Sequence, residues 1–324
     1  MKTLLEIKNL NKIYTAGRGL FRKSVSELKA VEDLSFDLKE KDTLAIVGES
    51  GCGKSTTAKC IIRLTEPSSG EVIFDGIDLT KLSNEEMRLK RRNIQMIYQD
   101  PYSSLNPRMK VKELLAEPLR AHKLAEGKAI IEQVREIAGM VGLSTEHLDR
   151  YPHQFSGGQR QRISIGRALI SRPKLLLADE PVSALDVSIQ AQILNLLTDL
   201  QKTLGLTMLF ISHDLNVVRH ISRQILVMYL GRVMESGPTE TVFENPMHPY
   251  TKALLDSIPV LDPSIKKERK TLKGDVLSLA QKPEGCPFSG RCINIMEKCK
   301  TEIPPPIDLG NNHIVSCFWR SHET

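Results

Sequence analysis

One stretch decides the fold of this 324-residue chain: Gly48-Glu49-Ser50-Gly51-Cys52-Gly53-Lys54-Ser55. It fits the spacing G-x-x-x-x-G-K-[ST], directly after the apolar run Thr43–Val47 and before a helix expected to begin near Lys54. Glycines let successive backbone N–H groups curl around phosphates, and the helix N-terminus adds partial positive charge. Lys54 is expected to reach the β- and γ-phosphates, and the Ser55 hydroxyl to bind Mg²⁺. The stretch therefore predicts a site for a nucleoside triphosphate.

Strand-like runs alternate with helical patterns on both sides of this loop. Strands come first, and strand and helix then alternate, which is the order that an α/β sheet requires. We therefore predict an α/β fold of the P-loop type with an antiparallel β subdomain. The predicted strands are Leu4–Ile7, Leu34–Leu38, Thr43–Val47, Glu71–Phe74, Ile94–Tyr98, Lys174–Ala178, Thr207–Ile211 and Ile225–Met228.

Two further regions interrupt or follow this alternation. Val111–His122 and Lys128–Gly142 have amphipathic helical patterns with no strand between them, which predicts a helical subdomain at about 101–165. A short helix at Thr251–Ser257 precedes the Pro- and Lys-rich stretch Asp262–Lys273, which is typical of a linker. The expected boundaries are one large domain at 1–260 and, at 261–324, a linker with a Cys-rich extension.

Composition excludes several classes of protein. The net charge of +6 comes from 45 basic and 39 acidic residues that are interspersed, so nucleic-acid binding is not expected. Apolar runs such as Ile225–Leu230 fall far short of the ~20 residues that cross a bilayer. The start of the chain lacks the apolar core of a signal peptide, so neither a membrane span nor export is expected.

A pair of carboxylates follows another apolar strand. Leu175-Leu176-Leu177-Ala178 runs into Asp179 and Glu180. At such a strand end Asp179 can hold the Mg²⁺ shell, and Glu180 can orient or deprotonate an attacking water. Glu180 is thus the predicted catalytic base for nucleotide hydrolysis.

Phe155-Ser156-Gly157-Gly158-Gln159-Arg160-Gln161-Arg162 resembles the signature motif of ABC ATPases, LSGGQ, with Phe155 in place of Leu. The resemblance extends over about residues 4–260. It covers Gln99 (the Q-loop), Ser183-Ala184-Leu185-Asp186 (the D-loop) and His213 (the switch histidine), and Tyr14 matches the aromatic that stacks on adenine, although Lys12–Arg22 is loop-like.

The family resemblance implies a set of roles. Ser156 and its glycines, leading into a helix from about Gln159, offer N–H groups to a phosphate held by another subunit, in a head-to-tail dimer closing over two ATPs. Glu180 and His213 are the implied catalytic residues, and Ser55, Gln99 and Asp179 the implied Mg²⁺ ligands. The ATP-binding residues would be Tyr14, Gly48, Ser50, Gly51, Gly53, Lys54, Ser55, Thr56, Gln99, Ser156, Gly157, Gly158, Gln159, Asp179 and Asp186.

Two segments resemble one group within that family. Gln99–Arg108 and His248–Leu255 are similar to the ATPases of oligopeptide and dipeptide importers, and the long loop Ala16–Leu28 to the second of their two paralogous ATPases. This implies two permease subunits, a paralogous or identical ATPase partner, an extracytoplasmic binding protein, and a place at the cytoplasmic face of the cell membrane. Because related systems import nickel or oligosaccharides, the cargo stays open. An ABC ATPase acting on ribosomes or DNA is disfavoured, because this chain has one cassette and no long coiled-coil insertion.

Four cysteines crowd the C-terminal region: Cys286, Cys292, Cys299 and Cys317. By count, four thiolates fit an iron–sulfur cluster or a zinc ion equally. The absence of a C-x₂-C pair disfavours a zinc ribbon, and the pattern resembles an extension of the importer ATPases that in some members carries a [4Fe–4S] cluster. We expect that cluster, with Zn²⁺ or free thiols as alternatives.

Overall fold

The computed structural model describes residues 2–15, 27–258 and 282–319, and the chain divides into two compact units. Unit 1 comprises residues 1–4, 38–43 and 75–211, and unit 2 comprises residues 5–37, 44–74 and 212–324. No helix in the described ranges combines the length and the hydropathy needed to cross a membrane.

Unit 1 contains a parallel set of strands, β6 (Ile94–Ile97), β7 (Leu175–Asp179) and β8 (Thr207–Ser212). Strand β7 lies between the other two, with Leu175 opposite Ile94 on one side and Thr207 on the other. Every residue of β7 and β8 is buried, which explains why both run as continuous apolar stretches rather than as alternating ones. The unit also holds the short strand β5 (Ile77–Asp78).

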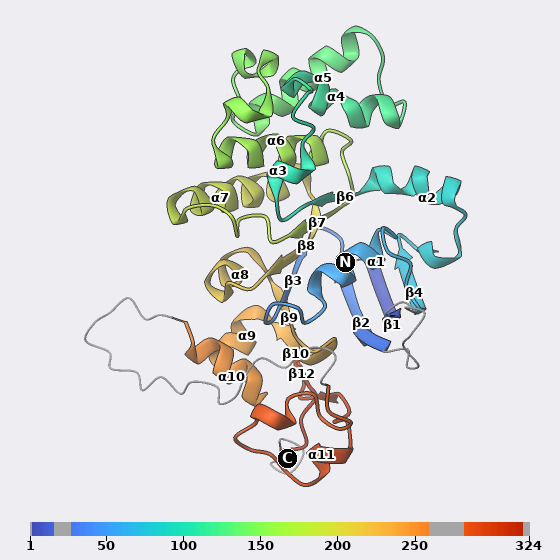
Figure 1. Ribbon diagram of the computed structural model, residues 1–324, viewed down its shortest axis with the longest axis vertical. Coiled ribbons are helices and arrows are strands. Elements are labelled where there is room, and N and C mark those ends of the chain that lie inside the picture. Colours follow the sequence, from blue (N-terminus) through green and yellow to red (C-terminus); the bar gives the residue numbers. More distant parts are fainter. Residues whose placement is uncertain (1, 16–26, 259–281, 320–324) are drawn as a thin grey trace, which may run out of the picture. The chain divides into compact units, whose positions relative to one another are not determined.

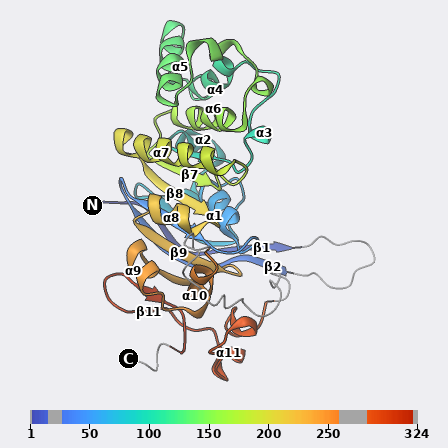
Figure 2. The same ribbon diagram turned by 90° about the vertical axis from the view of Figure 1, so that its left-hand side faces the viewer.

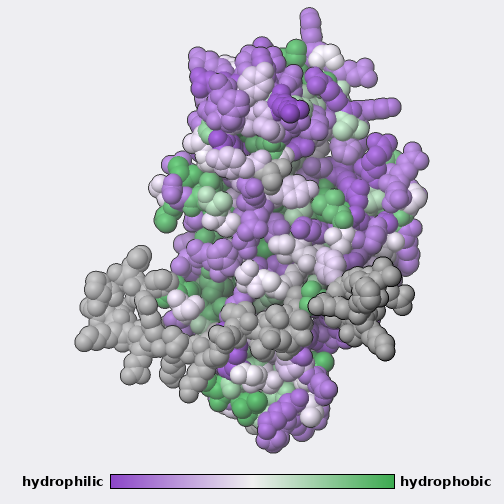
Figure 3. Space-filling model, viewed as in Figure 1, coloured by the Kyte–Doolittle hydropathy of each residue, from purple (hydrophilic) through white to green (hydrophobic). Residues whose placement is uncertain are grey.

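The helices of unit 1 form mainly after β6. Helices α4, α5 and α6 pack on one another (green in Figure 1), and Gly166 lets α6 approach Leu115 of α4, where an added Cβ would lie 3.1 Å from its Cδ2. Hydrophilic residues predominate over α4 and α5 on the face in Figure 3. The bounds are α2 (Asn84–Lys90), α3 (Pro101–Ser104), α4 (Val111–Ala121), α5 (Lys128–Met140), α6 (Gly157–Leu169) and α7 (Val187–Leu204), with 3₁₀ helices at Leu79–Lys81, Arg91–Asn93, Thr145–Asp149 and Pro152–Gln154.

Unit 2 holds strands in two groups. Strands β1 (Thr3–Thr15) and β2 (Glu27–Lys39) run side by side (blue in Figure 2), and β1 pairs antiparallel with β4 (Ser69–Phe74). In the second group β3 (Thr43–Val47) pairs parallel with β9 (Gln224–Tyr229), which pairs antiparallel with β10 (Arg232–Pro238).

The C-terminal region adds its own strands to the second group. Strand β12 (Ile314–Val315) pairs with β10, with Val315 opposite Glu235, and β11 (Ile307–Asp308) pairs with β12. Residues beyond 282 therefore share a sheet with β9 and β10. The helices of unit 2 are α1 (Lys54–Ile61), α8 (Leu215–Ile221), α9 (Thr239–Glu244), α10 (Pro249–Asp256), a 3₁₀ helix at Ser289–Arg291, and α11 (Lys298–Thr301).

All eight predicted strands and the two helices of the insert are confirmed, but some boundaries were wrong. Lys12–Thr15, predicted as part of a loop, continues β1, in line with the strand propensity of Ile13, Tyr14 and Thr15. Glu27 and Leu28 likewise begin β2, while 16–26 lie outside the described residues. The predicted linker Asp262–Lys273 also lies outside them, so the boundary near 260 stays a prediction.

Candidate nucleotide site

The predicted phosphate loop joins β3 to α1 in unit 2. A Cβ at Gly48 would lie 2.2 Å from the carbonyl oxygen of Met228, and one at Gly53, where φ is 108°, would lie 2.2 Å from that of Ala30. Neither position has room for a side chain, because neighbouring backbone approaches both. These two glycines therefore allow the tight path of the loop between β3 and α1.

Lys54 lies inside the loop rather than at its surface. Its side chain is 4% exposed, and its Nζ donates to the carbonyl oxygens of Gly48 at 2.7 Å and Glu49 at 3.0 Å. An ammonium held this way can exchange a loop carbonyl for a phosphate oxygen without a large movement of its stem. Ser55 and Thr56 follow half-buried in the first turn of α1, while Ser50 and Gly51 are exposed.

The predicted catalytic carboxylates close strand β7 in unit 1. Asp179 is 4% exposed, and Glu180 follows it with φ at 47°, a left-handed conformation that is costly for a residue with a side chain. The Glu180 N–H donates to the carbonyl of Ile211 at 3.0 Å, and Gln99 Nε2 donates to its carboxylate at 3.1 Å. The structure thus brings together the Q-loop glutamine and the predicted base.

The signature segment caps helix α6. Ser156 is the N-cap: its Oγ accepts from the Gln159 N–H at 3.4 Å, and Gln159 Oε1 accepts from the Ser156 N–H at 3.1 Å. A Cβ at Gly158 would lie 2.5 Å from Ile189 of α7, so glycine allows α6 to approach α7. The helix begins at Gly157, not near Gln159 as predicted, because this reciprocal capping box sets its start.

The remaining predicted site residues lie in three other segments of the chain, one after β8, one at the start of α7 and one near the end of β1. Asp186 is the exposed N-cap of α7, and its carbonyl accepts from the Gln190 N–H at 2.8 Å. His213 is exposed just after β8. Tyr14 lies near the end of β1, 39% exposed, with Lys12 Nζ 4.9 Å from its ring centroid. Their roles toward ATP stay predictions.

Residues that the sequence did not assign to the site support the phosphate loop from the C-terminal side. The Glu49 N–H donates to Tyr250 Oη at 3.0 Å, and Arg291 Nη1 donates to both carboxylate oxygens of Glu49 at 3.0 and 2.8 Å. Tyr229, Tyr250 and Phe288 pack together with ring centroids 4.7–5.3 Å apart. The sequence does contain one signal of this contact. Glu49 is an acidic residue in a loop that binds an anion, and such a residue needs a cationic partner.

The predicted metal centre is not supported. Among residues 2–15, 27–258 and 282–319, no group of three or more His, Cys, Asp or Glu is arranged to hold a metal ion. Cys286, Cys299 and Cys317 are buried and Cys292 is half-buried, all as thiols. Burial, with a smaller contribution from the neighbouring cysteines, raises the pKa of Cys286 to about 12 and that of Cys292 to about 11.

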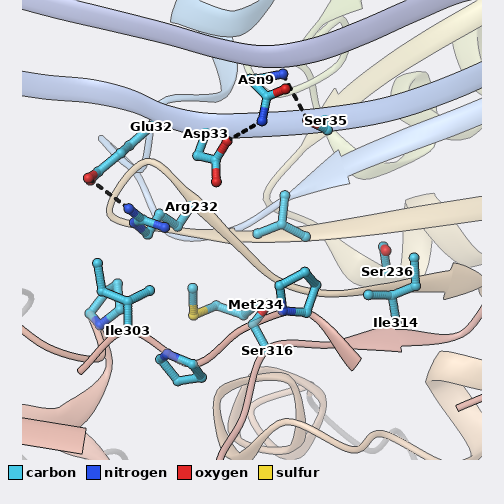
Figure 4. Close-up of a pocket in the computed structure, with 14 residues that line it drawn as sticks. Asn9, Glu32, Asp33, Ser35, Arg232, Met234, Ser236, Ile303, Ile314 and Ser316 are labelled. Carbon is cyan, nitrogen blue, oxygen red and sulfur yellow. Dashed lines mark hydrogen bonds and ion pairs between the residues drawn. The ribbon is translucent and has the colours of Figure 1, made fainter. Parts of the chain in front are cut away.

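A cavity of about 310 Å³ lies elsewhere in unit 2, between β1, β2, β10 and the C-terminal region (Figure 4). Glu32 and Arg232 form an ion pair at its wall, at 2.8 Å, and Asn9 donates to Asp33. None of the predicted nucleotide-binding residues lines this cavity. It is therefore separate from the candidate site.

Comparison with known proteins agrees with these motifs. Residues 31–183 match the ABC transporter family, and residues 234–299 match the C-terminal region of oligopeptide/dipeptide transporters. The chain is 49% identical to the oligopeptide transport ATP-binding protein AppF of Bacillus subtilis, over 99% of this chain and 98% of that protein. It is 47% identical to the dipeptide transport ATP-binding protein DppF of Haemophilus influenzae, over 97% and 96%.

A solved structure extends the likeness to the fold. The dimeric ATP-binding cassette MJ0796, in a post-hydrolysis state bound to ADP and Pi, aligns with a TM-score of 0.65 at 30% identity, covering 73% of this chain and 99% of that one. The fold is thus that of a P-loop ABC ATPase. Near full-length relatives at almost half identity leave no doubt about the family: this chain belongs to the ABC transporter ATP-binding proteins, in the oligopeptide/dipeptide group.

Proposed function

We propose that this chain is the ATP-hydrolysing subunit of an importer for dipeptides or oligopeptides. The observation that carries the proposal is the near full-length similarity to ATP-binding proteins named for oligopeptide and dipeptide transport. It is supported by the C-terminal match to oligopeptide/dipeptide transporters, which covers residues outside the ATPase motifs. Cargo enters through partner proteins, so the peptide class follows from this relationship and not from a pocket in this chain.

The residues of the phosphate loop bind ATP in this proposal. Lys54 exchanges its bonds to the Gly48 and Glu49 carbonyls for oxygens of the β- and γ-phosphates, and the N–H groups at the start of α1 face the same anion. Tyr14 would stack on the adenine. Because the lysine is already buried and aimed into the loop, little reorganisation is needed before binding.

The second group of residues cleaves the bound ATP. Glu180 orients and deprotonates the attacking water, which requires that its carboxylate leave the hydrogen bond from Gln99 or share it with the water. Ser55, Gln99 and Asp179 offer hydroxyl, amide and carboxylate oxygens, the donor types that Mg²⁺ prefers, and are the proposed ligands. The metal would neutralise charge on the β- and γ-phosphates. His213 and Asp186 are proposed to sense the γ-phosphate and the partner subunit.

The partners follow from the same proposal. Ser156 to Gln159 would close on the γ-phosphate bound by a second ATPase, paralogous or identical, and two permeases would receive the movement. A binding protein outside the membrane would deliver cargo, and this chain would lie at the cytoplasmic face. The domain boundary near 260 and the Cys-rich extension belong to this proposal too.

For the four cysteines we propose metal analysis of anaerobically purified protein. Brown colour with iron would establish an iron–sulfur cluster. Colourless protein with zinc or with no metal would exclude the cluster.

Uptake tests the proposed function directly. A strain lacking this chain should lose growth when a dipeptide or oligopeptide is its only source of a required amino acid. The wild-type gene should restore growth, and Lys54→Ala should not, because it removes the cation that binds the phosphates. Normal growth on peptides together with a lost uptake of nickel or of an oligosaccharide would contradict the peptide assignment.

A further inference from the structure

The phosphate loop contains an acidic side chain that works against its purpose. Glu49 directly follows Gly48, its carbonyl accepts a hydrogen bond from Lys54, and its side chain is 19% exposed. A carboxylate this close to a polyphosphate repels it, and partial burial strengthens the repulsion because little water screens it. The loop therefore needs a cation that neutralises Glu49 without occupying the phosphate position.

Arg291 supplies that cation from the C-terminal region. Its side chain is 6% exposed, and its Nη1 donates to both Glu49 oxygens, at 3.0 and 2.8 Å, and to Tyr229 Oη at 3.5 Å. An arginine stays charged at every physiological pH, so the neutralisation is permanent. The pair joins residues 242 positions apart in the sequence.

The surroundings fix this pair in place. Phe288 packs edge-on against Tyr229 at 5.3 Å and tilted against Tyr250 at 5.3 Å, and Tyr250 Oη accepts the Glu49 N–H. All three rings are almost completely buried. Backbone and side chain of Glu49 are thus both held by groups that the C-terminal half of unit 2 provides. A movement of the 3₁₀ helix at Ser289–Arg291 would therefore displace the side chain of Glu49 in the loop.

We propose that Arg291 is a positioning residue for ATP binding: it neutralises Glu49 and so lets the phosphate loop accept the nucleotide, which makes the C-terminal extension part of the nucleotide site. This rests on the proposed function of Gly48–Thr56 as an ATP site. It gives the extension a role in the reaction cycle that does not depend on a metal. It also predicts that changes in the extension alter ATP affinity.

A second buried ion pair in the same unit provides a matched control. Arg232 donates to Glu32 at 2.8 Å, with side chains 18% and 14% exposed, and Lys282 also binds Glu32. This pair joins β10 to β2 at the cavity in Figure 4, and the ion pairs described for Glu32 and Arg232 involve no side chain of the phosphate loop. Breaking it removes a comparable interaction without leaving a charge in the loop.

The test is calorimetric binding of the non-hydrolysable analogue AMP-PNP with Mg²⁺ to the full chain. Arg291→Ala should weaken binding roughly tenfold, which corresponds to about 1.4 kcal/mol of lost binding free energy. The double variant Arg291→Ala with Glu49→Gln should regain most of the lost affinity, because the unpaired carboxylate is gone. Arg232→Ala should lower the thermal unfolding midpoint and leave the AMP-PNP affinity within about twofold. Arg291→Gln, nearly isosteric but uncharged, should behave as Arg291→Ala and replaces it if that variant does not fold.

The outcomes distinguish the role of Arg291 from the assignment of Gly48–Thr56 as an ATP site. If the double variant binds as weakly as Arg291→Ala or Arg291→Gln, or if Arg232→Ala weakens binding equally, Arg291 acts through stability alone and the proposal is wrong. If the wild-type chain does not bind AMP-PNP, or binds it equally after Lys54→Ala, the assignment of the ATP site itself fails.

Discussion

The two groups of predicted site residues differ in how firmly the fold holds them. In the phosphate loop, Lys54 is 4% exposed and tied to two carbonyls, and Glu49 is bound through both its N–H and its carboxylate. At the end of β7, Glu180 has a strained left-handed backbone, and the hydrogen bond described for its carboxylate comes from the exposed Gln99. The binding residues are thus built in advance, while the hydrogen bond from Gln99 to the predicted base is one that a ligand can exchange.

The largest effect should come from the group at the end of β7. Glu180→Gln keeps the shape and the hydrogen-bonding capacity toward Gln99 but removes the base, so we expect turnover to fall by about 10²–10⁴-fold. AMP-PNP affinity should stay within about twofold, because Glu180 belongs to the cleavage step. Phosphate release and calorimetry measure the two quantities. Glu136→Gln, which removes an exposed carboxylate paired with Arg172, is the control and should leave both unchanged. Unaltered turnover in the Glu180 variant would remove it from the catalytic role.

The next effect is the pH dependence of stability behind the phosphate loop. There His248 accepts the N–H of Tyr250, whose hydroxyl accepts the Glu49 N–H. His248 is completely buried, and burial lowers its pKa to about 4 although the Glu235 charge acts in the opposite direction. Its Nδ1 accepts the Tyr250 N–H at 3.0 Å, which requires the neutral ring. Since the unfolded chain binds a proton near pH 6.5 and the folded one does not until about pH 4, stability is full above pH 6.5 and falls as the pH drops toward 4. The loss should be on the order of 3 kcal/mol.

Denaturant unfolding between pH 4 and 7 measures this loss. His248→Asn keeps an N-cap acceptor for the Tyr250 N–H but does not titrate, so its stability should fall less over the same window. Glu235 also faces this region and accepts from His313 at 2.7 Å, so His313→Asn serves as the control for a change in that neighbouring hydrogen bond. If wild type and His248→Asn lose equal stability between pH 6.5 and 4, protonation of His248 is not the cause of the loss.

The sequence predicted what depends on local spacing and missed what depends on distant partners. Lys54 lies where its motif placed it, because a glycine-rich turn between a strand and a helix leaves few other paths. The pair Glu49–Arg291 spans 242 positions, and nothing in either neighbourhood specifies the other. The end of β1 at Lys12–Thr15 was missed although Ile13, Tyr14 and Thr15 favour strands, because a polar and glycine-containing stretch directly follows them. For the four cysteines, a count of donors could not supply the arrangement that a metal needs.

The smallest expected effect separates two roles of Ser156, the N-cap residue of α6 in the signature segment. Ser156→Ala removes the Oγ that accepts from the Gln159 N–H and should cost about 1 kcal/mol of stability, measured by thermal unfolding. Ser156→Asp keeps a side-chain cap and favours the helix dipole, so its stability should equal or exceed that of wild type. Its charge, however, would lie where the γ-phosphate of a partner subunit should dock, so ATP turnover should fall more than in Ser156→Ala. If turnover instead changes in parallel with stability in both variants, Ser156 only caps α6. The signature segment would then take no part in binding the phosphate.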